Sequence, residues 1–392
     1  MASPTKRNKT KRPSLFDGLE IGPSTLSHRL SGPVNLAESL CRSMRSTLRL
    51  GEGTVCARSL RGVETHFTIA MDSAYDYKIL HQEFDPEAVF PEIVALGNQL
   101  SEVLQSHLTS EQEAAFEDHI LDCLARMVYG SNMIERAGAG SQITLKLCHA
   151  IFRGEKIPED IGETDEEFLT LKQSLVRNNL PADTSAVLRS RREIVQHAKA
   201  AAYIVNQLCI RGQDLSEEII LETHRILTYR VDAESTPWTE YSGVYRSAEV
   251  SAGLHPFPHP LLVPHLMKAM IGELEFDLKK AMDSGTIDPI AMAAKYTHAF
   301  VNIHPFIDGN GRMCRLILNT LLLKLGSFFV SIGEGQADRE VYLDIATNAS
   351  ALEDMYQDAE DEEKPKLYKE LSSFVLVHVK RSMSKLIKAV AR

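Results

Sequence analysis

The sequence predicts a mainly α-helical protein with one short β-hairpin. Apolar residues recur with a helix-like period in most segments after about residue 86. Several of these segments begin at a residue that commonly caps a helix, and one of them ends at a glycine. A hairpin-like pattern, with short strand-forming runs between glycines and prolines, occupies residues 236–264.

The composition is typical of a globular protein and excludes several classes of function. Of the 392 residues, 44% are hydrophobic and 24% are charged. The net charge of −10 argues against nucleic-acid binding, because such proteins usually carry a basic face. The six cysteines form no CxxC pair and no short Cys/His cluster, so no zinc site is expected. Since neither a secretory signal nor an apolar run of about 18 residues is present, we expect a cytoplasmic or nuclear protein without a membrane partner.

The N-terminal region contains a basic tail and a segment that the sequence describes poorly. Residues 1–14 combine several lysines and arginines with no acidic residue, which favours a disordered tail over a nuclear signal. Residues 15–110 have no readable role, although 87–108 show the apolar period of a helix. By position alone, this region is a candidate for target recognition.

The remaining elements are predicted from periodicity and capping residues. Ser110 to Glu113 have the pattern of a capping box, and the helix that they begin extends to about Tyr129 and on towards Glu135. Asp288 is expected to cap a helix with proline at its first position. The predicted hairpin strands are 244–246 and 249–251, and 353–363 should be an exposed acidic loop. Further helices are predicted at 142–153, 186–209, 216–227, 266–282, 288–301, 310–325 (ended by Gly326) and 366–390.

Residues 304–315 combine the groups needed to bind a nucleotide phosphate. Gly309, Asn310 and Gly311 begin a helix, and the unpaired amides and positive dipole end of a helix start bind anions. Arg312 and Arg315 are three residues apart and therefore share a helix face. Guanidinium groups make bidentate contacts with phosphate oxygens, so both arginines are candidate phosphate ligands.

Two further side chains of this segment can supply chemistry. Asp308 can hold Mg²⁺, which proteins usually bind through one or two carboxylates together with substrate phosphates. His304 has an imidazole whose ordinary pKa lies near neutrality, so it can take a proton from an attacking hydroxyl. Each residue taken alone is more often structural; their combination predicts attack on a nucleotide phosphate.

The segment HPFIDGNGRMCR at 304–315 resembles the Fic family motif HxFx(D/E)GNGRxxR at every specified position. The similarity extends over roughly residues 130–350. It implies a Fic-type helical core with a short β-hairpin flap, within residues 111–352, followed by an acidic loop and a C-terminal helix at 353–392. It also implies that ATP, with Mg²⁺, donates AMP to a Ser, Thr or Tyr hydroxyl of a target protein.

The resemblance assigns a role to each residue of the motif. His304 would be the base, and Asp308 would coordinate Mg²⁺ between the α- and β-phosphates. Arg312 and Arg315 would bind the β- and γ-phosphates. The anion nest would consist of Gly309, Asn310 and Gly311.

Residues outside the motif are assigned by the same resemblance. The flap would hold the backbone of the target by strand addition. Tyr342 and Asn348 are candidates for contacts with adenine, at a spacing that departs from that of familiar family members. The flap residues are Val250, Ser251, Ala252 and Gly253.

An upstream segment resembles the inhibitory helix of many Fic proteins. Ser131 to Glu135 fit the first five positions of the pattern (S/T)xxxE(G/N), whereas Arg136 replaces the expected Gly or Asn. The implied inhibitory helix lies near 111–136. Glu135 would pair with Arg315, deprive the γ-phosphate of its partner and leave ATP misaligned. Inhibited family members often form dimers, so a homodimer is one expected assembly.

Three other functions are compatible with these residues. The pocket could remove AMP from a modified protein, with Glu135 orienting a water molecule, or it could transfer another group, such as UMP or phosphocholine. A non-catalytic interaction module is disfavoured because His304 and Asp308 are both present. A P-loop kinase is excluded because no GxxxxGK[ST] occurs. The sequence does not identify the target protein.

Overall fold

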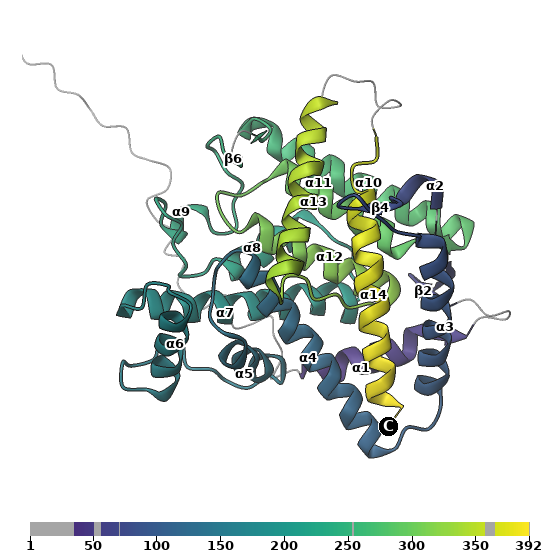
Figure 1. Ribbon diagram of the computed structural model, residues 1–392, viewed down its shortest axis with the longest axis horizontal. Coiled ribbons are helices and arrows are strands. Elements are labelled where there is room, and N and C mark those ends of the chain that lie inside the picture. The colour runs from purple at the N-terminus through teal and green to yellow at the C-terminus, as the bar shows by residue number, and fades with distance from the viewer. Residues whose placement is uncertain (1–34, 51–55, 70, 253–254, 357–364, 392) are drawn as a thin grey trace, which may run out of the picture.

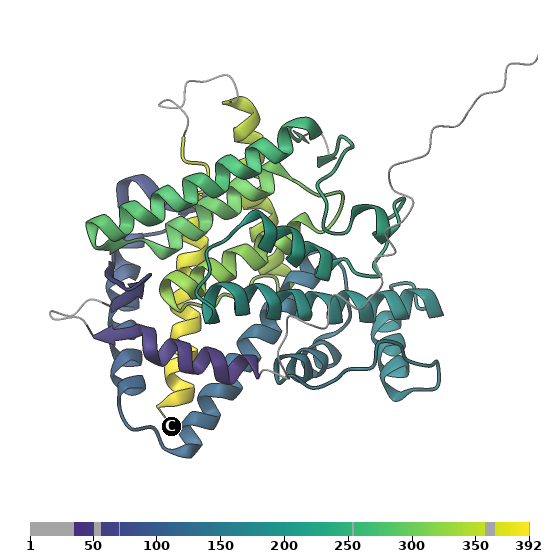
Figure 2. The ribbon, with the colours of Figure 1, turned by 180° about the vertical axis from the view of Figure 1, so that it is seen from behind.

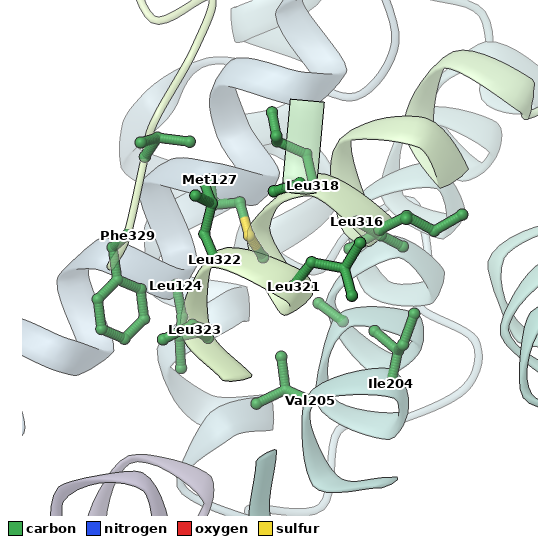
Figure 3. Packing of buried hydrophobic residues seen from close by; sticks show 14 of the residues in the cluster. Leu124, Met127, Ile204, Val205, Leu316, Leu318, Leu321, Leu322, Leu323 and Phe329 are labelled. Atoms are coloured by element: carbon green, nitrogen blue, oxygen red, sulfur yellow. The ribbon is translucent and has the colours of Figure 1, made fainter. Parts of the chain in front are cut away.

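Helix α12 (Asn310–Gly326) lies at the centre of the protein and is buried along almost its whole length. Its leucines pack against side chains of α4 (Ser110–Ile134) and α7 (Thr184–Val205), as the cluster in Figure 3 shows. The computed structural model describes residues 35–50, 56–69, 71–252, 255–356 and 365–391. The predicted basic tail 1–14 therefore lies outside the described residues.

The expectation of a mainly α-helical fold is confirmed (Figure 1). The remaining helices are α1 (Leu36–Thr47), α2 (Met71–Ala74), α3 (Pro86–Gln105), α5 (Ser141–Phe152), α6 (Glu166–Arg177), the π-helical turn η2 (Asn206–Ile210), α8 (Glu217–Leu227), α9 (Trp238–Tyr241), η3 (Pro260–Leu262), α10 (Val263–Ser284), α11 (Pro289–Ile303), α13 (Gln336–Met355) and α14 (Lys369–Val390). The strands are β1 (Leu48–Leu50), β2 (Cys56–Leu60), β3 (Val63–Phe67), β4 (Lys78–Ile79), β5 (Gln82–Glu83), β6 (Ser251–Ala252), β7 (His255–Pro256) and β8 (Thr286–Ile287).

The long helix α4 begins with a capping box one residue earlier than predicted. Thr109 has an extended backbone, and its side chain accepts a hydrogen bond from the amide of Gln112, whose side chain in turn accepts from the amide of Thr109. The predicted box of Ser110 and Glu113 is wrong, because Ser110 is already helical and a capping residue lies outside the helix.

Several elements were not predicted from the sequence. Helices α6 and α13 were missed, and α13 includes 353–355, which were expected to be loop. The sheet β1–β2–β3–β8 was also missed. Its parallel contact pairs His66 with Thr286, so a sequence pattern within one window cannot reveal it.

The observed hairpin differs from the predicted one. Strands β6 and β7 pair Ser251 with Pro256 and Ala252 with His255, whereas 244–246 are not a strand. Arg246 is instead buried, and its backbone amide donates to the carbonyl of Pro305 (2.9 Å). The flap residue Gly253 lies outside the described residues.

Helix α14 lies beside α3 and α4, and α1 crosses α4 on the opposite side of the molecule (Figures 1 and 2). The N-terminal elements share the hydrophobic core with the rest of the chain, through residues such as Leu40 and Leu100. No helix in the described ranges is long and apolar enough to cross a lipid bilayer.

Candidate active site

The loop between α11 and α12 is shaped by backbone conformation and by one asparagine. His304 ends α11 with a left-handed backbone (φ 49°), and Gly309 precedes α12 with φ 82°, a region that favours glycine. The Asn310 side chain accepts from the amide of Phe306 (3.0 Å) and donates to its carbonyl (2.8 Å). Asn310 therefore closes the loop with its side chain, which leaves its backbone amide at the start of α12 for an anion.

His224 of α8 contacts the backbone and a side chain of the loop. Its Nδ1 accepts from the amide of Gly243 (2.9 Å), so Nε2 carries the proton and donates to the carbonyl of Asp308 (2.9 Å). The ring stacks on Phe306, with the centroids 3.6 Å apart. Burial lowers the pKa of His224 to about 4, so the ring stays neutral near neutral pH and can keep both hydrogen bonds.

Arg246 supports the loop from the side of the hairpin. Its buried guanidinium donates to the carbonyls of His304 (2.7 Å), Ala248 (3.1 Å) and Pro258 (2.6 Å). Its backbone amide also donates to the carbonyl of Pro305 (2.9 Å). One side chain thus joins the backbone of His304 to both ends of the hairpin.

Replacing Arg246 with Ala should lower the free energy of unfolding by about 3 kcal/mol or more, because each buried acceptor left unpaired costs about 1–3 kcal/mol. Urea unfolding of the whole chain measures this loss. Arg177→Ala, an exposed position on α6, is the matched control and should stay within about 0.5 kcal/mol of the parent. A loss of less than about 1 kcal/mol for Arg246→Ala would show that the carbonyls find other donors.

The His304 ring contacts Val301 and Phe257. Its Nδ1 lies 3.1 Å from the carbonyl of Val301, which can only accept, so Nδ1 carries the proton and Nε2 the lone pair. The ring stacks on Phe257, with the centroids 3.8 Å apart and the planes 15° from parallel. Phe257 also donates its amide to the carbonyl of Val250, at the base of the hairpin. The histidine and the hairpin are therefore coupled through one aromatic residue.

Arg312 presents buried donors at the start of α12. Its side chain is 5% exposed, and Nη2 donates to Asp308 (3.1 Å). Its Nε and Nη1 are buried and have no hydrogen-bond partner within the described ranges. Buried donors without partners are costly, so this arrangement is suited to an anion that approaches the guanidinium.

Arg315 is held by the last turn of α4. It donates to the Ser131 hydroxyl (2.8 Å) and carbonyl (3.1 Å), and to the Glu135 carboxylate (2.6 Å). The carboxylate also lies against Gly311, where an added Cβ would come within 2.1 Å of the Glu135 Oε1. The carboxylate of Glu135 therefore lies against Gly311 and Arg315, and it interacts electrostatically with Arg312.

The charges in this cluster stabilise one another. Burial by itself raises the pKa of Glu135, but the charge and hydrogen bond of Arg315 hold it below the ordinary value. Burial by itself lowers the pKa of Arg315, but Glu135 raises it above the ordinary value. Both groups are thus charged near neutral pH, and the pair is an ion pair.

Other contacts fix the end of α4 and were not foreseen from the sequence. Arg339 of α13 donates twice to the carbonyl of Ile134 (2.9 and 3.1 Å). The buried Asn132 lies 2.7 Å from Nδ1 of His197, on α7. Burial, together with the positive charges of the two site arginines, lowers the pKa of His197 and keeps it neutral. Asn132 lies within the segment predicted to be inhibitory, and His197 lies in the predicted helix 186–209, but neither position indicated this contact.

The other predicted site residues lie at different distances from the cluster. The ring of buried Tyr342 is 5.7 Å from the guanidinium carbon of Arg315. Asn348 is exposed on α13 and forms no hydrogen bond or ion pair with the cluster in the part of the chain described. Ser251 is exposed at the hairpin.

The donor set fits Mg²⁺ bound together with a nucleotide rather than alone. Asp308 is about one-third exposed and is the carboxylate next to the amide nest on the loop side. Among the described residues, no group of three or more His, Cys, Asp or Glu could hold a metal by itself. One carboxylate plus phosphate oxygens is a common way to bind Mg²⁺, and the unpaired nitrogens of Arg312 would receive the phosphates.

Comparison with known proteins relates part of the chain to a family. Residues 214–322, from the turn before α8 through most of α12, match the model of the Fic/DOC family. The chain contains a Fic/DOC family domain. The matched range includes His224, Arg246 and the whole of the 304–315 loop, so the residues that shape the loop belong to the Fic/DOC domain.

Curated relatives match over part of their length. The protein adenylyltransferase Fic of Drosophila yakuba is 32% identical over 160 residues, which are 40% of this chain and 30% of the relative. The protein adenylyltransferase Fic of Nematostella vectensis is 30% identical over 158 residues. A Fido domain-containing protein of Dictyostelium discoideum is 41% identical over 102 residues, 26% of this chain and 66% of that protein. The aligned part thus spans about a third of the length of the adenylyltransferases.

Solved structures share the fold. A Fic domain-containing signaling protein of Bacteroides thetaiotaomicron matches with a TM-score of 0.52 and 19% identity, over 76% of this chain and 97% of that one. A Fic-1 fragment from C. elegans matches with a TM-score of 0.52 and 19% identity, over 78% of this chain and 73% of that one. The helical fold around the Fic/DOC domain is therefore that of solved Fic structures.

Proposed function

We propose that this protein transfers AMP from Mg-ATP to a Ser, Thr or Tyr hydroxyl of a target protein, and that Glu135 holds it in a state of low activity. One observation carries the proposal: the start of α12 gathers two buried arginines and an amide nest around the carboxylate of Glu135. A site built for an anion thus holds an anionic side chain of the chain itself.

The residues of the site can perform each part of the transfer. The target hydroxyl oxygen attacks the α-phosphorus, and the bond from that phosphorus to the bridging oxygen of pyrophosphate breaks. His304 Nε2 takes the hydroxyl proton, because Nδ1–H is engaged with Val301. Pyrophosphate leaves with the electron pair, and Arg312 and Arg315 stabilise its charge. Asp308 would hold Mg²⁺, which neutralises phosphate charge when bound.

The hairpin is proposed to present the target. Val250 to Gly253 would pair with an extended segment of the target, as strand addition does at other exposed strands. Phe257 contacts both the hairpin and the His304 ring, so a hydroxyl delivered by the paired segment would arrive next to the base. Tyr342 and Asn348 are proposed to face the adenine side of the nucleotide.

The proposed inhibition follows from competition for one position. While Glu135 is paired with Arg315, the γ-phosphate lacks this guanidinium, and the α-phosphorus is not aligned with the attacking oxygen. The relatives named protein adenylyltransferases support AMP as the transferred group.

The decisive experiment uses ATP labelled at the α- or the γ-phosphate with the Glu135→Gly variant. We expect label from the α-phosphate, but not from the γ-phosphate, to stay on protein. Stable γ-label would instead indicate phosphoryl transfer and would contradict the proposal. If no label is transferred but the wild type releases AMP from a modified protein, the site is a hydrolase in which Glu135 orients water.

A further inference from the structure

A cavity with a volume of about 720 Å³ lies between α4, α14 and the segment 329–338. Its volume falls within the range of small-molecule binding sites. Helix α4 contributes His119, Cys123 and Arg126, whose spacing places them on one face of the helix. Ser131 and Glu135 lie on a different face, because the helix turns by about 100° per residue. One helix therefore contributes to both this cavity and the proposed active site.

The acidic side chains around the cavity are already paired. The Asp122 carboxylate lies 2.9 Å from Nε2 of His149. Glu334 lies 2.9 Å from Arg126, and Asp338 lies 3.0 Å from His378. Glu334 thus forms an ion pair with Arg126, whereas the two histidines offset the charges of Asp122 and Asp338 only when they are protonated.

Three further cations line the cavity. Arg381, Lys385 and Lys388 lie four and three residues apart, on one face of α14. None of the three forms an ion pair with a residue that the structure describes. In a chain with a net charge of −10, this concave cluster is an exception that favours a negatively charged ligand.

Polar atoms and apolar walls complete the lining. His119 Nε2 and Ser331 Oγ are buried, and neither has a hydrogen-bond partner among the described residues. Such atoms are expected to be satisfied by a ligand or by water. Phe329 and Val330, which are both buried, also line the cavity.

We propose that this cavity binds a small molecule that carries two or more phosphate groups, and that the bound molecule holds α4 against α14. Arginine and lysine in a row provide separate positions for separate phosphates. The volume exceeds what one phosphate needs, which favours a larger ligand.

The bound molecule would act on the end of α4 through the segment that it contacts. An added Cβ at Gly130 would come within 2.3 Å of the carbonyl oxygen of Ile332, so α4 and this segment are in close contact. Arg339, one residue after the lining Asp338, binds the carbonyl of Ile134, which precedes Glu135. A ligand that binds only when α4, 329–338 and α14 are together stabilises that arrangement. The effect of the bound molecule on the end of α4 matters for activity only through the proposed inhibition by Glu135, and this part of the inference rests on that proposal.

The binding test uses inorganic pyrophosphate and the full chain carrying Arg312→Ala, which weakens the active-site cradle. We expect isothermal titration calorimetry to detect pyrophosphate binding in this variant. Adding Arg381→Glu and Lys385→Glu should weaken the binding about a hundredfold or more, because two charge-assisted contacts are lost. Adding Lys172→Glu instead, at an exposed position on α6, is the control and should leave the affinity for pyrophosphate unchanged. Absence of binding in Arg312→Ala, insensitivity to the charge reversals, or equal affinity for citrate would each overturn the phosphate site.

The coupling to α4 is tested by hydrogen exchange. Pyrophosphate should slow amide exchange at residues 127–135 in Arg312→Ala, and should not do so in the charge-reversed protein. Unchanged exchange despite binding would overturn the effect on α4. Neither measurement requires AMP transfer, so their failure is distinguishable from failure of the proposed activity.

Discussion

The His304→Ala variant, made in the Glu135→Gly background, is expected to lose AMP transfer by about 10²–10⁴-fold, the usual contribution of a general base. The physical reason is the fixed tautomer: Nδ1–H donates to the Val301 carbonyl, so Nε2 is the nitrogen that can accept a proton. The Phe257 ring holds the imidazole plane next to the hairpin. Transfer of α-label from ATP to protein, followed over time, measures the loss.

The loss must come from chemistry and not from unfolding or nucleotide binding. The His304→Ala variant should bind ATP with nearly unchanged affinity, because the arginines of α12 are untouched, and should melt close to its parent. His265→Ala, an exposed histidine of α10, is the matched control and should retain full transfer. If the His304→Ala variant transfers AMP at a rate within about threefold of its parent, His304 is not the general base.

The Glu135→Gly variant is expected to transfer AMP about 5- to 150-fold faster than the wild type, which corresponds to a coupling of about 1–3 kcal/mol. The Glu135 side chain is 37% exposed and Arg315 is 4% exposed, so their pairing lies between a surface and a buried ion pair. Surface pairs contribute about 0–1 kcal/mol, and breaking buried pairs costs about 3–5 kcal/mol. An intermediate gain is therefore expected when the carboxylate leaves the cradle.

Two further variants separate inhibition from general loosening of α4. Glu111→Gly removes an exposed glutamate from the first turn of the same helix and should not change transfer. Glu135→Gln keeps the shape but removes the charge, and should give an intermediate rate. ATP affinity should rise in Glu135→Gly, because Arg315 becomes available to the γ-phosphate. If Glu135→Gly is no faster than the wild type, the inhibitory role is wrong.

The loop at 304–315 was predicted from the sequence because its chemistry is local. Glycines, arginines and an acid at fixed spacing around a helix start predict an anion site without knowledge of the rest of the fold. The structure places these residues together at the start of α12, as that spacing requires. The structure adds one detail about Asn310. Its side chain bonds the backbone of Phe306, so only its backbone amide can take part in the predicted anion nest.

The supporting residues could not be predicted in the same way. His224 and Arg246 donate hydrogen bonds to backbone carbonyls of the loop, although they lie tens of residues before it in the sequence. The residues next to them in the sequence do not indicate these contacts. The hairpin was misplaced for the same reason, because the backbone amide of Arg246 donates to the distant carbonyl of Pro305 and not to a neighbouring strand. The sheet contact between His66 and Thr286 is likewise invisible to any local pattern.

By itself, the sequence determined the helical fold and predicted an anion site at the start of α12 with a candidate base and metal ligand, because periodicity and motif spacing act within one helix or turn. The contact of Glu135 with Arg315, which the family resemblance implied, is present in the structure. Only the tertiary structure decided that His304 has one defined tautomer and that a cavity lies between α4, α14 and the segment 329–338. The reason is physical: contacts between distant segments depend on how helices pack, and packing is decided by the whole core and not by any one segment.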